Sequence, residues 1–190
     1  MNRAPRLVGT RIILRRPLKR DIDDRLRLGR HPEIVRIFGG DTRNLQPITN
    51  QEAIAWYQGM LARPLEWTIE FYKRWIGNVR LTLDEPNYRA RFAIGIFDPS
   101  LLGMGLGSEA IRLILNYAFN ELHLHRIDLR VLQYNKRAVY CFEKCGFRRE
   151  GIEREGALIE NRWETDVIMS ILEQEYRRLL NTDSERNQLQ

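Results

Sequence analysis

The sequence predicts a mixed α/β fold of the α+β kind, with one central, mostly antiparallel sheet flanked by helices. Three strand candidates follow one another closely at 66–72, 75–83 and 89–97, and such short connections are typical of an antiparallel meander. The third strand then leads through a glycine-rich turn and a helix at 107–122 into a further strand at 125–132. A connection of this kind is right-handed and places its two strands parallel and adjacent, so we expect a mixed sheet.

The length of the chain indicates a single domain. Its 190 residues are enough for one substantial core and short for two ordinary domains. Neither an internal repeat nor a low-complexity linker interrupts the sequence. We therefore expect one domain over 1–180, followed by a polar tail over 181–190 that frays.

The segments before the meander predict one strand and two helices. Alternation of apolar residues over 10–18 indicates a strand, and helical spacing of apolar residues over 19–30 indicates a helix. The second helix covers 49–62, where Thr49 stands at the start and Glu52 follows three residues later. This spacing is typical of a capping box, in which each of the two side chains accepts a backbone N–H of the other residue.

The C-terminal segments predict a helix and two closing strands. Residues 135–145 have helical spacing, and Gly146 is a good stop signal for that helix. Two strands are then expected at 147–160 and 162–176, around a turn near Asn161.

The charge balance favours an anionic ligand over nucleic acid. Lys and Arg total 31 against 25 Asp and Glu, which gives a formal net charge of +6. Acidic residues are interspersed throughout, so no long basic block indicates a nucleic-acid surface. We see no secretion signal at the N-terminus, and no apolar run is long enough to span a membrane. These features predict a cytoplasmic protein with no membrane and no nucleic-acid partner.

The two cysteines, Cys141 and Cys145, lie one helical turn apart. No His or further Cys stands near them at the spacing of a zinc site. We expect a buried or half-buried thiol pair and no metal.

The stretch "DPSLLGMGLGSEAIRLILNYAF" over 98–119 alternates three glycines, Gly103, Gly105 and Gly107, just before a helix. Backbone N–H groups at a helix start bind anions, and glycine allows a close approach. The lysine of a Walker A loop is missing, and the spacing G-x-G-x-x-G of a dinucleotide fingerprint is not present. A phosphate site and a plain structural turn both remain open from this stretch alone.

A longer set of segments resembles a known family. The run of "IGIFDP", "LLGMGLGSEAIRLILNYAF", "LHLHRIDLRVLQYN" and "KRAVYCFEKCGFRREG" is similar to the GCN5-related N-acetyltransferases (GNAT). The resemblance is greatest to the branch with the ribosomal-protein N-terminal and the spermidine acetyltransferases, and it extends over about 10–172.

The resemblance implies where acetyl-CoA binds, as a co-substrate and without a metal. Two parallel strands would splay apart to hold it, with the pyrophosphate on the loop N–H groups and the pantetheine arm along the edge of "GIF". Asn135 would reach the arm from the other side, and Arg137 could reach a phosphate. The implied cofactor-binding residues are Ile96, Phe97, Leu102, Gly103, Met104, Gly105, Leu106, Gly107, Ser108, Asn135 and Arg137.

The sequence departs from its relatives where a general acid and base would be expected. Phe142 stands where many acetyltransferases carry a tyrosine, and Ala93 stands where many members of the branch carry glutamate. Ala138 replaces a serine found in some relatives. None of these three side chains can transfer a proton.

Three other residues are weaker candidates, namely Tyr140, Glu70 and His125. Tyr140 is about 200 degrees from Phe142 around a helix, Glu70 is a strand carboxylate, and His125 begins a strand at the end of the sheet. We therefore assign no catalytic residue from the sequence.

The resemblance implies an N-acetyltransferase that acts on a primary amine of a small molecule or of a peptide N-terminus. A CoA-binding regulatory domain with weak or no catalysis is the alternative, because the usual acid and base are absent. The acceptor stays open, and the resemblance also allows a homodimer through the C-terminal strands.

Overall fold

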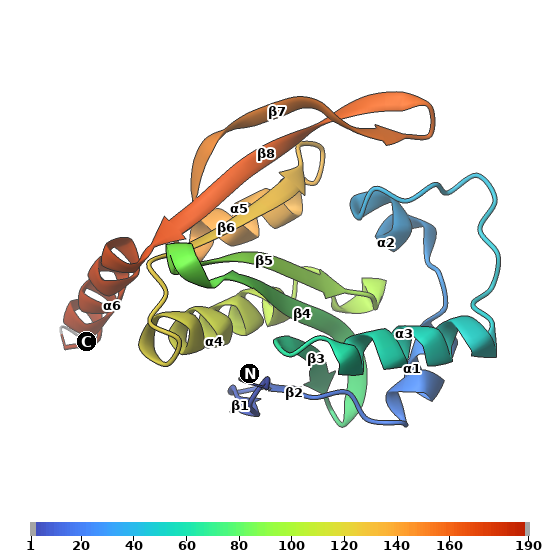
Figure 1. Ribbon diagram of the computed structural model, residues 1–190, viewed down its shortest axis with the longest axis horizontal. Helices are drawn as coiled ribbons and strands as arrows, with labels where there is room; N and C mark the ends of the chain where they lie inside the picture. Colours follow the sequence, from blue (N-terminus) through green and yellow to red (C-terminus); the bar gives the residue numbers. More distant parts are fainter. Residues whose placement is uncertain (1–2, 189–190) are drawn as a thin grey trace.

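A computed structural model describes residues 3–188, which fold around one eight-stranded sheet in the order β1-β2-β3-β4-β5-β6-β8-β7 (Figure 1). The strands are β1 (Leu7–Val8), β2 (Ile12–Arg15), β3 (Glu66–Phe71), β4 (Arg74–Asp84), β5 (Arg89–Ile96), β6 (Arg126–Leu132), β7 (Arg148–Ile159) and β8 (Arg162–Leu172). The helices are α1 (Asp21–Leu28), α2 (Pro32–Ile37), α3 (Asn50–Ala62), α4 (Leu106–Asn120), α5 (Lys136–Lys144) and α6 (Glu173–Gln188). Among these helices, none has the length and apolar character needed to cross a membrane.

The strands β5 and β6 are the parallel pair of this sheet, and every other neighbouring pair is antiparallel. Their register pairs Arg89 with Arg126, Ala90 with Ile127 and Arg91 with Asp128, and pairing stops there. Both strands continue beyond that point, so they splay apart toward their carboxyl ends. The predicted mixed sheet and its crossover are confirmed.

The two faces of the sheet differ in what covers them. Helices α4 and α5 pack on one face, against a core that includes Val79 of β4, Phe92 of β5 and Leu129 of β6. Side chains alternate between faces along a strand, so Arg80 and Ala93, which are direct partners in the β4–β5 register, lie on the opposite face. We call these the α4 face and the open face.

The start of α4 explains one of the three glycines. Gly105 is the N-cap residue and has a φ of 80°, in the left-handed region that glycine adopts without strain. The helix then buries a continuous stripe at helical spacing against the sheet. The buried stripe consists of Leu106, Ala110, Ile111, Ile114, Leu115 and Ala118.

The predicted capping box of α3 is confirmed. The Thr49 hydroxyl accepts the Glu52 N–H at 3.2 Å, and the Glu52 carboxylate accepts the Thr49 N–H at 2.8 Å. Hydrogen bonds from the Thr49 backbone, then from Arg30 and the Thr49 hydroxyl, lower the pKa of Glu52 to about 2. The local sequence therefore specifies where this helix begins.

A buried ion-pair network attaches α1 to the open face. Arg15 of β2 donates to Glu70 at 2.6 Å and to Asp21 at 2.8 Å, and Arg20 also donates to Glu70 at 2.7 Å. Although burial opposes ionisation, these hydrogen bonds hold the pKa of Glu70 below its ordinary value. Glu70 is thus a structural anion in the interior of the fold.

Two features at the chain ends differ from the sequence predictions. The last strand ends at Leu172 and not at 176, because α6 begins at Glu173. The Glu175 carboxylate accepts the Leu172 N–H at 3.0 Å, and the Glu173 N–H donates to the His125 carbonyl at 3.0 Å. The predicted polar tail over 181–190 falls within α6 as far as Gln188, and 189–190 lie outside the described residues.

The short helix α2 was not expected from the sequence either. Pro32 occupies its first turn, where the missing N–H costs no hydrogen bond. The segment is too short to present a clear apolar period, and tertiary contacts hold it in place, as described below.

Candidate active site

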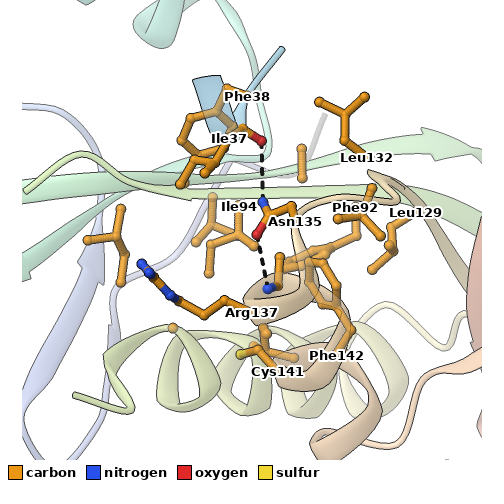
Figure 2. A pocket seen from close by; sticks show the side chains of 18 of the residues that line it. Ile37, Phe38, Phe92, Ile94, Leu129, Leu132, Asn135, Arg137, Cys141 and Phe142 are labelled. Carbon is orange, nitrogen blue, oxygen red and sulfur yellow. Dashed lines mark hydrogen bonds between the residues drawn. The ribbon is translucent and has the colours of Figure 1, made fainter. Parts of the chain in front are cut away.

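A cavity of about 750 Å³ occupies the place where β5 and β6 splay apart (Figure 2). Its walls come from both faces of the sheet. Phe92, Ile94 and Ile96 of β5 line it on the α4 face, whereas Ala93 and Gly95 line it on the open face. The cavity therefore connects the two faces through the gap between the parallel strands.

The loop over residues 103–108, which we call the glycine loop, presents unpaired backbone donors to this cavity. Within the described residues, the N–H groups of Gly103, Gly105, Leu106, Gly107 and Ser108 donate no hydrogen bond. Four of these five residues begin α4 or cap it, so its helix dipole adds a partial positive charge. A group of this kind fits a phosphate or another anion.

The open edge of β5 provides a second set of backbone groups. The Phe97 N–H donates to the Ile76 carbonyl of the neighbouring β4 at 2.8 Å. Hydrogen bonds alternate along an antiparallel ladder, so the N–H and C=O groups of Ile94 and Ile96 point away from β4 and toward the gap. An extended ligand arm would pair with Ile94 and Ile96, whereas Phe97 contributes its side chain.

A close approach of two glycines holds β4 against this part of β5. A Cβ atom on Gly77 would lie 2.1 Å from the Gly95 carbonyl oxygen, so no other residue fits there without a backbone shift. A Cβ on Gly95 would lie 2.7 Å from the ring of Phe38, which therefore packs directly over β5. These two positions require glycine for space and not for a positive φ.

Ten of the eleven cofactor-binding residues predicted from the sequence line the cavity. The exception is Met104, whose side chain is 47% exposed and whose N–H donates to the Leu101 carbonyl at 3.4 Å. The Met104 carbonyl accepts Arg11 Nη1 at 2.8 Å, and Arg11 also binds Glu109 of α4. Met104 thus anchors the loop from behind and does not face the cavity.

Asn135 and Arg137 both line the cavity (Figure 2), and each already has a protein partner. The Asn135 side-chain oxygen caps α5 by accepting the Ala138 N–H at 3.2 Å, and its amide donates to the Ile37 carbonyl at 3.2 Å. Arg137 lies 3.2 Å from Glu33 of α2. These contacts connect α5 to α2 across the cavity, a role that the sequence did not indicate.

Residues around α2 cover the cavity on the open face. Ile37, Phe38 and Gly39 line the cavity, although no local motif marks them in the sequence. The Tyr134 hydroxyl donates to the Arg36 carbonyl at 2.6 Å, which holds α2 on the loop after β6. Farther along, Thr42 donates its N–H to Glu160 at the turn of the β7–β8 hairpin at 2.8 Å. Segments distant in sequence therefore close this side of the cavity.

The positions where an acid or base was expected are part of the wall and remain unable to transfer protons. Ala93, Ala138 and Phe142 line the cavity. Phe142 is buried and contacts Phe92 and Phe147 edge to face or nearly so. Phe142 therefore packs as a core side chain at the position where a tyrosine was expected.

The three weaker candidates for an acid or base differ in their position relative to the cavity. Tyr140 lines the cavity but is 68% exposed, while His125 is exposed and lies outside the cavity wall. Glu70 also lies outside the wall, and Arg15 and Arg20 neutralise it. Of these three, only Tyr140 can contact a ligand in the cavity.

The cavity wall also contains two titratable groups that the sequence did not indicate as an acid or a base. Asp166 of β8 is half-buried, and burial together with the charge of Glu153 raises the pKa of its carboxyl. Cys141 of α5 lies 3.2 Å from the Ser108 hydroxyl. A hydrogen bond from Cys145, then one from Ser108, lowers the pKa of Cys141 against the effect of burial.

Comparisons with known proteins agree with this geometry. The sequence profile of the acetyltransferase (GNAT) domain matches residues 11–148. The "Probable N-acetyltransferase YjcK" of Bacillus subtilis is 42% identical over 80 residues, which cover 42% of this chain and 44% of that protein. The spermidine N(1)-acetyltransferase of Vibrio cholerae is 38% identical over 107 residues, which cover 55% of this chain and 60% of that protein. The match thus spans about half the length of these relatives.

The solved structures extend the likeness to the whole fold. Spermidine N-acetyltransferase from Vibrio cholerae, in complex with CoA and spermine, superposes with a TM-score of 0.73 at 27% identity. That superposition covers 88% of this chain and 99% of the other. Together with the splayed parallel strands and the glycine loop, these matches establish that the chain belongs to the GNAT acetyltransferase family.

Proposed function

We propose that this protein transfers an acetyl group from acetyl-CoA to a primary amine, either of a small molecule or of a peptide N-terminus. One observation carries the proposal: a single cavity joins the unpaired N–H groups of the glycine loop to the open backbone edge of Ile94 and Ile96. The first feature fits a pyrophosphate and the second fits an extended amide-containing arm. The solved relative with CoA bound has the same fold.

The proposed reaction needs no covalent enzyme intermediate. A neutral amine attacks the thioester carbon, a C–N bond forms, and the C–S bond breaks as CoA thiolate leaves. The proton lost by the amine is balanced by the proton that the thiolate takes up. The N–H of Ile94 faces the gap and would stabilise the oxygen that becomes negative in the transition state.

Asp166 is our candidate for the group that receives the amine proton, directly or through water. It is a half-buried carboxylate in the cavity wall, and its raised pKa brings it closer to that of a useful base. Tyr140 is our candidate for protonating the thiolate, since it lines the cavity from α5 and carries a hydroxyl group.

A CoA-binding regulatory domain is the second candidate function. It is favoured by Ala93, Ala138 and Phe142, three side chains in the wall that cannot act as acid or base. Binding of acetyl-CoA without turnover of any amine would support it.

The test is a calorimetric titration with acetyl-CoA, with NADH and ATP as controls, followed by measurement of thiol release with a panel of amines. Micromolar binding of acetyl-CoA alone, with thiol release that depends on an added amine, is the expected result. If acetyl-CoA does not bind, both candidate functions fail and the glycine loop is only a structural turn. Binding without amine-dependent release would select the regulatory alternative.

A further inference from the structure

Charges in the cavity wall are distributed unevenly, and this distribution constrains the acceptor. On the open face, Arg80 of β4 lines the cavity and is only half-buried. Its guanidinium makes no hydrogen bond or ion pair with any residue in the described part of the chain. A half-buried cation without a carboxylate is costly, and a ligand that carries an anion would compensate for it.

The only carboxylate facing Arg80 across the β3–β4 ladder within the described residues is already occupied. Glu66 is the direct partner of Arg80 in the register, and its side chain is 7% exposed. Arg63 at the end of α3 lies 2.7 Å from the Glu66 carboxylate. Arg63 therefore neutralises the carboxylate that stands opposite Arg80 in this ladder, and this part of the wall keeps a net positive charge.

The position on the other side of Arg80 offers no compensation either. Its partner in the β4–β5 register is Ala93, whose side chain lies on the same face and carries no polar atom. Farther along this face, Arg25 of α1 lies 5.3 Å from the ring centre of Phe97, and Phe97 lines the cavity. Arg25 adds a second positive charge near the same side.

Across the gap, the balance has the opposite sign. Arg130 of β6 forms an ion pair with Glu153 of β7, and Asp166 is the register partner of Glu153 on β8. One guanidinium there faces two carboxylates, which leaves a net negative charge. An amine placed between β5 and β6 would have a carboxylate on one side and the free Arg80 on the other.

The phosphates of CoA are not the partner of Arg80. The glycine loop begins α4, and α4 packs on the α4 face, whereas Arg80 lies on the open face. Ala93, opposite Arg80, is three residues before Ile96 along β5, which is about 10 Å of strand. Arg80 is therefore free to contact the acceptor.

We infer that the acceptor is an amine that also carries a carboxylate, bound through Arg80, and that the polyamine of the named relatives is disfavoured here. The inference deepens the proposed function and rests on it for the position of the amine. Apolar wall residues next to the open face, among them Ile37, Leu132 and Ile159, favour an apolar side chain between the two polar groups.

The experiment measures binding, so that it does not depend on turnover. N-acetyl-L-leucine and its amide are titrated calorimetrically into the protein saturated with CoA. We expect the acid to bind at least tenfold more tightly than the amide, since a guanidinium–carboxylate contact of this kind is worth on the order of ten- to a hundredfold. Arg80→Gln should abolish that preference, and Arg80→Lys should keep part of it because the charge remains.

Arg91→Gln is the matched control. Arg91 lies on the same face of β5, but it is ion-paired with Asp128 at 3.1 Å and does not line the cavity. This variant should retain the wild-type preference, and all variants should bind acetyl-CoA as the wild type does. Their thermal unfolding curves would detect a folding defect.

The inference is overturned if the wild type binds acid and amide alike or binds neither, or if Arg80→Gln keeps the preference. Thiol release with leucine, leucine amide and spermidine is measured in parallel. An intact acid preference without any amine-dependent release would count against the proposed function and leave the carboxylate site in place. Release with spermidine alone, and equal binding of acid and amide, would overturn the carboxylate inference and leave the acetyltransferase.

Discussion

The two sides of the cavity are built from different parts of the chain. On the α4 face, the glycine loop presents backbone N–H groups from consecutive residues at the start of one helix. On the open face, Arg80, Arg130 and Asp166 present side chains from three different strands, and α2 covers them from a distant part of the sequence. The first side suits a ligand shared by a whole family, whereas the second can change by single substitutions.

This contrast explains why losing the usual acid and base does not disturb the fold or the loop. Ala93 and Ala138 lie in the wall, and neither of these two side chains carries a polar atom that a neighbouring side chain could depend on. A backbone site depends on conformation and is indifferent to most side chains, whereas a side-chain site is redefined by each exchange. If the two sides are independent, a substitution on one side should leave ligand binding on the other side unchanged.

The largest effect is expected from Gly107→Leu. A Cβ at Gly107 would lie 3.8 Å from Ile96 and 3.9 Å from Cys141, so it fits, but the longer side chain would extend into the anion site. Acetyl-CoA binding, measured by calorimetry, should weaken at least a hundredfold. The thermal midpoint should stay level or rise, because removing glycine from a helix stabilises it by roughly 0.5–1 kcal/mol. Gly151→Ala, where the added Cβ meets nothing within 4 Å, is the control. An unchanged affinity for acetyl-CoA would show that the glycine loop does not bind the cofactor.

Ala93→Glu should weaken carboxylate binding on the open face and leave acetyl-CoA binding at the glycine loop unchanged. The new carboxylate would stand directly opposite Arg80 and neutralise it, so the preference for N-acetyl-L-leucine over its amide should fall about tenfold. Acetyl-CoA affinity should change by less than about threefold. Ala93→Gln, of the same size without the charge, separates electrostatics from steric effects. A preference that survives in Ala93→Glu would argue that Arg80 does not contact the acceptor.

Asp166→Asn should lower kcat/KM several-fold and raise stability at neutral pH. The pKa of Asp166 is raised in the folded protein, so the fold favours the protonated form. Its contribution to stability is therefore present at low pH and is lost as pH rises through the raised pKa. The neutral variant should melt at a higher temperature than the wild type at pH 7, and the difference should shrink toward pH 4.

The same variant tests whether Asp166 accepts a proton in the reaction. In the wild type, kcat/KM should fall as pH is lowered through the raised pKa, because the carboxylate form is the one that accepts a proton. Asp166→Asn should lose that part of the pH profile. A variant with wild-type rates and an unchanged profile would show that Asp166 has no part in the reaction.

The smallest effect concerns Cys141. The lowered pKa of Cys141 and its place in the cavity wall predict alkylation by iodoacetamide near neutral pH. The hydrogen bond with Cys141, together with burial, raises the pKa of Cys145 and keeps that thiol unreactive. Acetyl-CoA should protect Cys141, as followed by mass spectrometry of the modified peptides. Cys141→Ser should bind acetyl-CoA within about twofold of the wild type. Equal labelling with and without acetyl-CoA would place the cofactor elsewhere.

Much of the loop side could be predicted because its signals are local. The glycines of the loop, the start of α4 and the capping box at Thr49 all depend on residues within one or two turns of chain. The strand–helix–strand passage also fixes the parallel pair by its handedness. Ten of the eleven predicted residues consequently line the cavity, and Met104 differs because its loop position turns it outward.

The partners of the predicted residues could not be foreseen. Asn135 is a helix cap that also holds the Ile37 carbonyl, and nothing in the local sequence connects these two positions. The sequence predicts the closing strand as far as residue 176, whereas α6 begins at Glu173, whose N–H donates to the distant His125 carbonyl. Long-range hydrogen bonds decided both features.

The sequence by itself determined the family, the sheet with its crossover and the glycine loop before α4, since each rests on short-range pattern and backbone conformation. Only the tertiary structure decided which charges remain uncompensated in the cavity. Arg80 is one of many arginines in the sequence, and it differs because register places it between Ala93 and a Glu66 that Arg63 already neutralises. The charge of a residue is set by its identity, but whether that charge is available to a ligand depends on neighbours brought together from distant strands.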